Sequence, residues 1–192
     1  MPCLLAIFEK YKVTPNFGIY ECGSDDKVLR RMNALIAAPE APSVIGVVLD
    51  TDEVGIKSRW QQINAKIEKY NYNIPPSPLR GGTILESQGG YPRLGVWLMP
   101  DNQQRGMLED FLLELMDPDA RVFTSDCVDS AVTAGLATFK EAHKTKSIVH
   151  TFLAWQDEPG KPLGQSVTSH ALNTNHPLVE EFIGWINNLF NS

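Results

Sequence analysis

The feature that most constrains the fold is a short apolar run that ends in acidic residues. Residues 44–49 read V-I-G-V-V-L, and D-T-D follows from Asp50 to Asp52. Apolar, β-branched residues bounded by polar ones predict a strand that is covered on both faces. Ligands of open α/β sheets bind just beyond the carboxyl ends of the strands. Asp50 and Asp52 are therefore candidate ligands for a hard divalent cation, which prefers oxygen atoms.

A structural explanation exists for the same two aspartates. Aspartate at a strand end can form an Asx turn, or can cap the next helix by accepting hydrogen bonds from its first backbone N–H groups. A D-x-D motif by itself is only a hypothesis for a metal site. Both interpretations stay open at the level of the sequence.

A second apolar run carries another acidic residue to a strand end. Residues 94–99 read L-G-V-W-L-M, and P-D-N follows with Asp101. If this strand and the strand over 44–49 are parallel neighbours, their ends lie about 5 Å apart. Asp101 would then join Asp50 at one edge of the sheet.

A helix is predicted over residues 107–115, where Leu108, Phe111, Leu112 and Leu115 recur at helical spacing. Glu109 lies near its start and is a further candidate for the acidic cluster. Converging carboxylates repel one another unless a cation lies between them. An acidic residue in the first turn is equally explained by the helix dipole.

The remaining pattern predicts an α/β fold of three layers, with a mostly parallel central sheet and a helical C-terminal part. Strand candidates alternate with amphipathic helices, as in parallel sheets with helices on both faces. We expect one domain over residues 1–192, helix-rich from about 124. Predicted elements include a strand over 17–22, helices over 56–70, 128–139 and 178–189, and an irregular loop over 72–91.

Composition restricts the class of protein. The net charge is −6, which disfavours a role in coating DNA, because nonspecific binding to nucleic acid requires a basic face. No apolar stretch approaches the roughly 20 residues of a membrane-spanning helix, and the first residues do not resemble a signal peptide. We therefore expect a cytoplasmic protein without a membrane partner.

The motifs D-T-D, W-L-M-P-D-N, G-M-L-E-D-F-L-L and H-T-F-L-A-W-Q occur in this order along the chain. Together they resemble an uncharacterised prokaryotic family with a Toprim-like fold, related to the Toprim domain of OLD-type nucleases. The resemblance covers nearly the whole chain. Toprim domains bind Mg²⁺ with a glutamate after the first strand and a D-x-D after a later strand.

The resemblance implies roles for four residues. It makes Asp50 and Asp52 ligands of Mg²⁺ or Mn²⁺ and Glu109 a later acidic residue of the site, while Asp101 is a candidate ligand only through its place at the second strand end. Lys146 matches a late lysine that would stabilise charge on a phosphate. A solvated lysine near a helix end is the alternative explanation for Lys146.

One departure from the Toprim pattern concerns the beginning of the fold. The strand that normally comes first, and its glutamate, have no counterpart here, so either the true start lies upstream or this version lacks both. A missing strand would leave backbone groups of a neighbouring strand unpaired. We therefore expect pairing with a second copy.

Two classes of function follow. The first is a Mg²⁺-dependent phosphoryl-transfer enzyme, nuclease-like, that acts on nucleic acid. The second is a non-catalytic module with a degenerate site that binds a nucleotide, a metal ion or a partner protein. The fold alone does not separate the two, because one fold hosts many functions.

Overall fold

The computed structural model describes residues 2–14, 16–51, 54–87, 89–156, 159 and 171–191. The chain divides into two compact units, each built from two separate stretches. The helical unit consists of Met1–Val13 and Leu108–Val179, and the sheet unit consists of Thr14–Met107 and Glu180–Ser192.

A small mixed sheet forms the centre of the sheet unit. In the described part of the chain its strands are β1 (Val44–Leu49), β2 (Thr83–Leu85) and β3 (Arg93–Leu98), in the order β1-β3-β2. The two predicted strands are parallel neighbours, as expected, and β2 pairs antiparallel with β3. The α/β class is confirmed, but the sheet described is mixed rather than mostly parallel.

Strand β2 corrects the prediction of an irregular loop over residues 72–91. Only Thr83–Leu85 pair with β3, and three residues are too few for an alternating pattern to be recognised in the sequence. The strand predicted over residues 17–22 is also wrong, because this segment forms no ladder in the structure. Most of its residues are exposed, so burial does not support a strand there.

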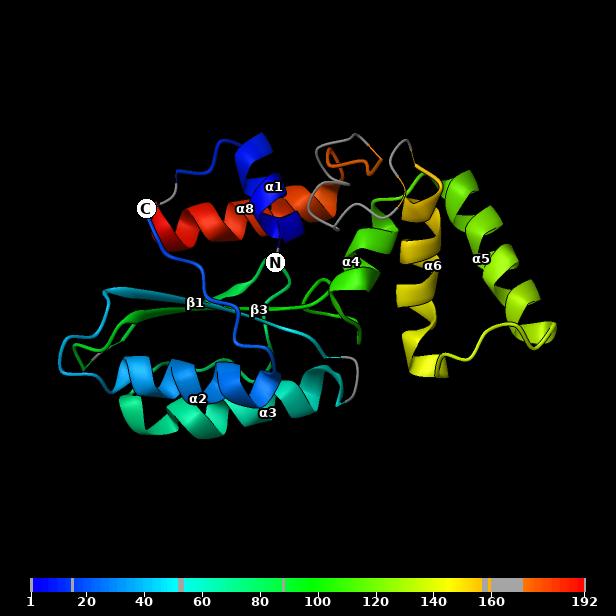
Figure 1. The fold of residues 1–192 in the computed structure, drawn as a ribbon. Helices are drawn as coiled ribbons and strands as arrows, with labels where there is room; N and C mark the ends of the chain where they lie inside the picture. The colour runs from blue at the N-terminus through cyan, green and yellow to red at the C-terminus, as the bar shows by residue number, and fades with distance from the viewer. Residues whose placement is uncertain are drawn as a thin grey trace. The chain divides into compact units, whose positions relative to one another are not determined.

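Helices α2 (Asp25–Ile36) and α3 (Gly55–Ile67) cover one face of the sheet (Figure 1). Their apolar sides meet alternate residues of the strands, because side chains along a strand point to opposite faces. The core contains Leu29, Met32, Ile36, Ile45, Val47, Leu49, Trp60, Ile63, Ile67, Leu94, Val96 and Leu98.

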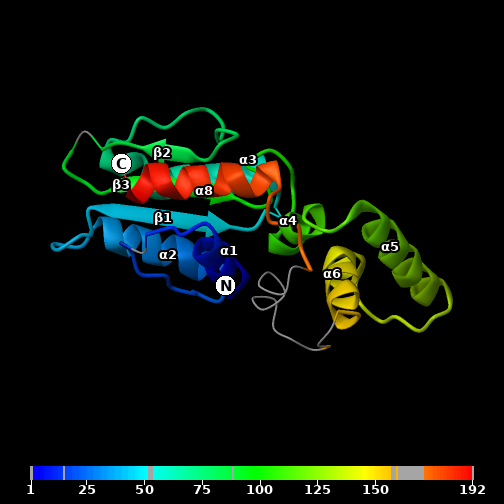
Figure 2. The same ribbon diagram turned by 90° about the horizontal axis from the view of Figure 1, so that it is seen from above.

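Helix α8 (Pro177–Phe190) lies along the opposite face of the sheet, as the view from above shows (Figure 2). Glycine on β3 makes this close approach feasible, since a β-carbon on Gly95 would overlap the side chain of Leu189. The ring of Trp97 on β3 packs at 5.0 Å from that of Phe182. Helices therefore pack on both faces of the small sheet.

The helical unit contains α1 (Pro2–Lys10), α4 (Leu108–Glu114), α5 (Pro118–Thr133), the short 3₁₀ helix η2 (Glu141–His143) and α6 (Lys144–Ala154). Helix α6 packs against both α4 and α5. Among the described residues, no helix combines the length and the apolar character of a membrane-spanning segment.

Helix α5 begins and ends earlier than the sequence predicted. Asp117 caps its start by accepting hydrogen bonds from the N–H groups of Asp119 and Ala120, at 3.0 and 3.1 Å. Its end is followed by Gly135, whose φ of +70° belongs to the left-handed region and is typical of helix ends. The bounds predicted for this helix, 128–139, were therefore wrong, because the cap at Asp117 sets an earlier start and Gly135 ends the helix.

Tyr72 makes the stability of the sheet unit dependent on pH. Its hydroxyl donates to the Pro92 carbonyl at 2.6 Å, and burial, followed by the nearby Tyr70 and Tyr91, raises its pKa to about 12. Because the folded pKa exceeds the unfolded value of about 10, this stabilisation is complete below about pH 10. It is lost as the pH rises through the folded pKa.

We expect the stability difference between wild type and Tyr72→Phe to fall by about 2 kcal/mol between neutral pH and about pH 12, since one pKa unit corresponds to about 1.4 kcal/mol. Urea denaturation at each pH measures this difference. Tyr20→Phe is the control, because Tyr20 is exposed and its variant should show no such change. A difference for Tyr72→Phe that stays constant with pH would contradict the prediction.

Candidate functional site

The carboxyl ends of β1 and β3 lie side by side. Leu49 and Leu98 are partners in the parallel register, so Asp50 follows one strand end and Asp101 follows the next. The structure thus places these two predicted ligands at the same edge of the sheet. Asp52, the second aspartate of D-T-D, lies outside the described residues.

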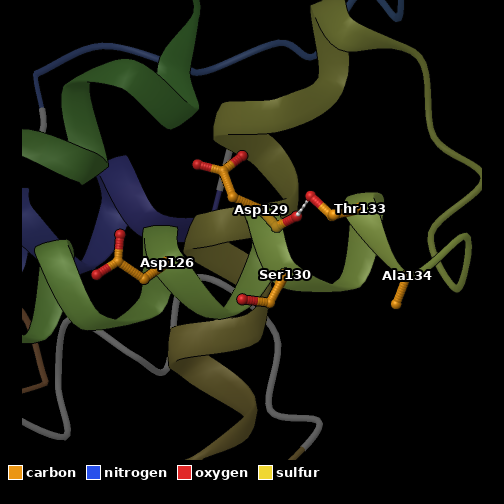
Figure 3. Close-up of a pocket in the computed structure, with 5 residues that line it drawn as sticks. All are labelled: Asp126, Asp129, Ser130, Thr133 and Ala134. Atoms are coloured by element: carbon orange, nitrogen blue, oxygen red, sulfur yellow. Dashed lines mark hydrogen bonds between the residues drawn. The ribbon is translucent and has the colours of Figure 1, made fainter.

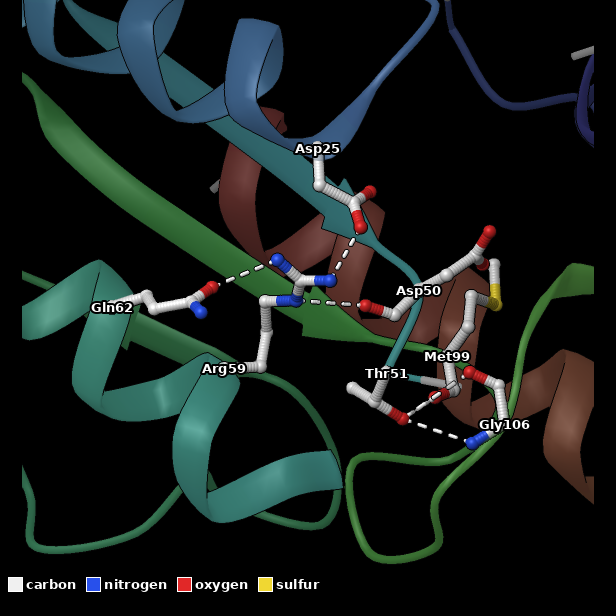
Figure 4. A network of polar contacts seen from close by, with 7 residues as sticks. All are labelled: Asp25, Asp50, Thr51, Arg59, Gln62, Met99 and Gly106. Atoms are coloured by element: carbon white, nitrogen blue, oxygen red, sulfur yellow. Dashed lines mark hydrogen bonds and ion pairs between the residues drawn. The ribbon is translucent and has the colours of Figure 1, made fainter. Parts of the chain in front are cut away.

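Thr51, the middle residue of D-T-D, fastens the loop after β3 to the end of β1 (Figure 4). Its buried hydroxyl donates to the Met99 carbonyl at 2.9 Å and accepts from the Gly106 N–H at 2.9 Å. Its own N–H donates to the Gly106 carbonyl at 2.7 Å. These bonds fix the position of Asp50 relative to the second strand end.

Arg59 of α3 bonds to the backbone of the same turn, from the face of the sheet that α2 and α3 cover. Only 4% of this residue is exposed. Its Nε donates to the Asp50 carbonyl at 2.9 Å, its Nη1 donates to Gln62 at 2.8 Å, and its Nη2 forms an ion pair with Asp25 of α2. In Figure 4 the Asp50 carboxylate points away from the guanidinium. Arg59 therefore positions the backbone at the strand end, while the Asp50 carboxylate lies on the side away from the guanidinium.

Asp101 organises the turn after β3. One of its carboxylate oxygens accepts from the backbone N–H groups of Gln103 and Gln104 at 2.9 and 2.7 Å, and the other accepts from the Gln104 side chain at 3.0 Å. This is the turn-forming role that aspartate commonly has. A carboxylate oxygen has a second lone pair, so the role does not prevent coordination of a cation.

Asn102 completes this turn and was not singled out from the sequence. It is fully buried and has a φ of +62°, a conformation that asparagine tolerates better than most residues. Its side chain accepts from the Leu98 N–H at 2.7 Å and donates to the Arg80 carbonyl at 3.0 Å. The P-D-N part of the W-L-M-P-D-N motif thus forms a turn whose Asp101 and Asn102 side chains are hydrogen-bonded within the protein.

Glu109 and Lys146, the other predicted site residues, lie in the helical unit and form an ion pair. The distance between Lys146 Nζ and Glu109 Oε1 is 3.2 Å. Glu109 is buried in the first turn of α4, whereas the Lys146 side chain, on α6, is 52% exposed. The sequence predicted both residues for a site but did not predict that they pair with each other.

The described residues supply part of the expected set of metal ligands. Asp50 and Asp101 bring two carboxylates to one edge, and carboxylate oxygens suit Mg²⁺ or Mn²⁺. Among the residues that the structure describes, no group of three or more His, Cys, Asp or Glu side chains is arranged to hold a metal ion. Within the described residues, the set of ligands for a divalent cation is therefore incomplete.

Comparison with known proteins identifies the family. The model of a family described as a protein of unknown function, DUF3226, matches residues 3–191. The chain belongs to the DUF3226 family. Searches among curated proteins and among solved structures gave no match. DUF3226 membership is shown over nearly the whole chain, while the resemblance to Toprim domains stays a prediction.

A surface hollow of this DUF3226 chain lies elsewhere, along α5 (Figure 3). Its central carboxylate, Asp129, pairs with Lys144 Nζ at 2.5 Å, and this hydrogen bond raises the pKa of Lys144. Asp129 is thus neutralised by a lysine of the same unit. The lining residues are Asp126, Asp129, Ser130, Thr133 and Ala134.

Two of the residues that shape the candidate site had weak signals in the sequence. Thr51 is a β-branched polar residue enclosed by two aspartates, and such a residue next to an apolar strand can use its hydroxyl within the fold. Arg59 lies one position before Trp60 on the apolar side of α3, and a charged residue there requires a partner. Neither signal identifies the groups with which Thr51 or Arg59 forms hydrogen bonds.

Proposed function

We propose that this protein is a Toprim-like module that binds Mg²⁺ or Mn²⁺ at the carboxyl edge of β1 and β3 and acts in phosphoryl transfer on nucleic acid. The parallel pairing of β1 with β3, which brings Asp50 and Asp101 to one edge, carries the proposal. Helices on both faces of the sheet are consistent with the three-layer, Rossmann-like arrangement of such domains.

The residues of this chain would have distinct roles in such a site. Asp50, Asp52 and Asp101 provide oxygen ligands, and Arg59 and Thr51 hold the first of these strand ends rigid. A bound divalent cation would polarise a phosphoryl oxygen and lower the pKa of bound water. Glu109 and Lys146 keep the catalytic roles that the Toprim resemblance implies, with Lys146 stabilising negative charge on a phosphate, and these roles are proposed from the sequence alone.

Calorimetric titration with Mn²⁺ and Mg²⁺ tests the metal site. We expect wild type to bind and Asp50→Asn to lose at least tenfold in affinity, because the amide removes the charge while keeping the size of the side chain. Asp126→Asn is the matched control, since Asp126 is exposed on α5 and its variant should bind as wild type does. Equal binding by the wild type and both variants, or absence of binding in all three, would overturn the proposed site.

A non-catalytic module is the second candidate. It is favoured by the commitment of Asp101 to its turn and of Glu109 to Lys146, which leaves fewer groups for chemistry. Cleavage of DNA or RNA with Mn²⁺, abolished in Asp50→Asn, would support the enzyme. Metal binding without turnover on these substrates would support the binding module.

A further inference from the structure

The strand order β1-β3-β2 extends the candidate site beyond the two predicted strand ends (Figure 2). Because β2 pairs antiparallel with β3, the segment just before β2 lies at the carboxyl end of β3. The carbonyl of Arg80 accepts a hydrogen bond from the Asn102 side chain at 3.0 Å, directly beyond that strand end. Neighbouring strands lie about 5 Å apart, so this edge of the sheet carries Asp50, Asp101 and Arg80 in this order.

Arg80 occupies a central position of a tight turn. The Gly82 N–H donates to the Leu79 carbonyl at 3.0 Å, as in a β-turn of four residues, and the Leu79 N–H donates to the Thr83 hydroxyl at 2.9 Å. Together with the hydrogen bond from Asn102, these contacts hold the backbone of the turn in place. The Arg80 side chain is nevertheless 78% exposed. The fold therefore fixes the backbone of Arg80 and presents its guanidinium to solvent.

The Arg80 guanidinium forms a weak ion pair with a carboxylate. Its Nη2 lies 3.6 Å from Oε1 of Glu181 on α8, and the Glu181 side chain is 35% exposed. Exposed pairs of this kind are weak, because water and salt compete for both charges. Arginine suits a phosphate in particular, because its planar fork donates two parallel hydrogen bonds to the phosphate oxygens. A bound phosphate can therefore replace Glu181 as the partner of Arg80.

We propose that Arg80 binds a backbone phosphate of the nucleic acid strand beside the metal-binding carboxylates. This inference rests on the proposed function, because it names a residue that holds the substrate of that same site. The carboxylates repel a phosphate unless a cation lies between them, whereas Arg80 attracts a phosphate directly. Although the net charge of the chain is −6, a cationic side chain at the site attracts a polyanion locally. The edge thus has an acidic side for the metal ion and a basic side for the substrate.

Two substitutions with opposite expected effects test the role of Arg80. The probe is a short fluorescein-labelled DNA strand with phosphorothioate linkages, which keep the charge and resist cleavage, and fluorescence anisotropy with Mn²⁺ present measures its affinity. We expect Arg80→Gln to bind about tenfold more weakly, because a charge-assisted contact is lost. Glu181→Gln should bind about threefold more tightly, because the competing carboxylate is neutralised. In Arg80→Gln the slope of log affinity against log salt concentration should also fall by about 0.7, the value for one phosphate contact.

Lys66→Gln is the matched control, since it removes the same charge elsewhere on the sheet unit. Helix α3 begins beside the end of β1, where the Gly55 N–H donates to the Thr51 carbonyl at 2.7 Å. Lys66 is exposed in the last turn of this helix, roughly 16 Å further along its axis. Lys66→Gln should therefore keep the DNA affinity and the salt slope of wild type. Calorimetric titration with Mn²⁺ should give an affinity close to wild type for all three variants, because none of the three side chains is a proposed metal ligand.

The outcomes separate this inference from the proposed function. A purely structural ion pair would change DNA binding in the same direction in Arg80→Gln and Glu181→Gln, since both substitutions break it, and that result would overturn the role of Arg80. Equal DNA affinity of wild type and Arg80→Gln, or an equal loss in Lys66→Gln, would overturn it too while the metal site stands. DNA binding through Arg80 without Mn²⁺ binding would overturn the metal site alone. A wild type that binds no DNA would refute both the nucleic acid substrate and the role of Arg80.

Discussion

Replacing Arg59 with methionine is expected to lower the free energy of unfolding by about 3 kcal/mol. The methionine keeps most of the buried volume and removes every donor. The Asp50 carbonyl, the Gln62 side chain and the Asp25 carboxylate would all lose their bonds to the guanidinium. Because Asp25 is partly exposed, water compensates for part of its loss, and the cost stays below that of a fully buried charge.

Arg80→Met is the matched control for this prediction. The Arg80 side chain is 78% exposed and lies 3.6 Å from Glu181, and pairs of this kind contribute about 0–1 kcal/mol. Urea denaturation followed by circular dichroism measures both variants. Equal losses in the two would show that Arg59 does not hold the strand end. The metal titration of Arg59→Met adds a functional readout, and weaker binding is expected because the Asp50 backbone is released.

Gly82→Ala is expected to be about as costly, at roughly 3 kcal/mol, for two separate reasons. Gly82 has a φ of +84°, where an L-residue costs about 1–2 kcal/mol. A β-carbon there would also overlap the Trp185 ring of α8, and overpacking costs about 1–3 kcal/mol. The ring is held in place because its Nε1 donates to the Thr83 carbonyl at 3.4 Å.

Gly90→Ala separates the two contributions. Gly90 also has a positive φ, of +76°, but a β-carbon there would meet no atom within 4 Å. Gly90→Ala should therefore show the backbone cost alone, about 1–2 kcal/mol. The difference between the variants in urea denaturation measures the contact with Trp185. If the two variants lose equal stability, the Trp185 ring of α8 does not restrict the side chain at position 82.

The elements with strong periodicity were the ones that the sequence predicted. The apolar runs of β1 and β3 and the order of strands and helices led to a parallel pair with acidic residues at one edge, which the structure contains. Short or locally determined features were missed. Strand β2 depends on pairing with β3 rather than on its own pattern, and the bounds of α5 depend on the cap at Asp117 and the turn at Gly135.

The sequence predicted which residue types form the candidate site, but it did not predict their hydrogen bonds and ion pairs. Asp50 and Asp101 were expected at one edge and lie there. The ion pairs of Glu109 with Lys146 and of Arg59 with Asp25 join residues far apart in the sequence, whereas the turn held by Asp101 is local. Such long-range polar contacts leave no periodic signal, since each depends on the final geometry of two or more elements.

The position of α8 has a consequence for biosynthesis. The face of the sheet that carries Trp97 is covered by residues that are translated long after β3 has left the ribosome. Until then the nascent chain holds β1, β2 and β3 with one apolar face bare, a state that invites chaperone binding or aggregation. Closing the sheet unit also requires contacts between distant parts of the chain, which slows folding. We therefore expect the return of α8, rather than the pairing of the early strands, to limit the rate at which the sheet unit folds.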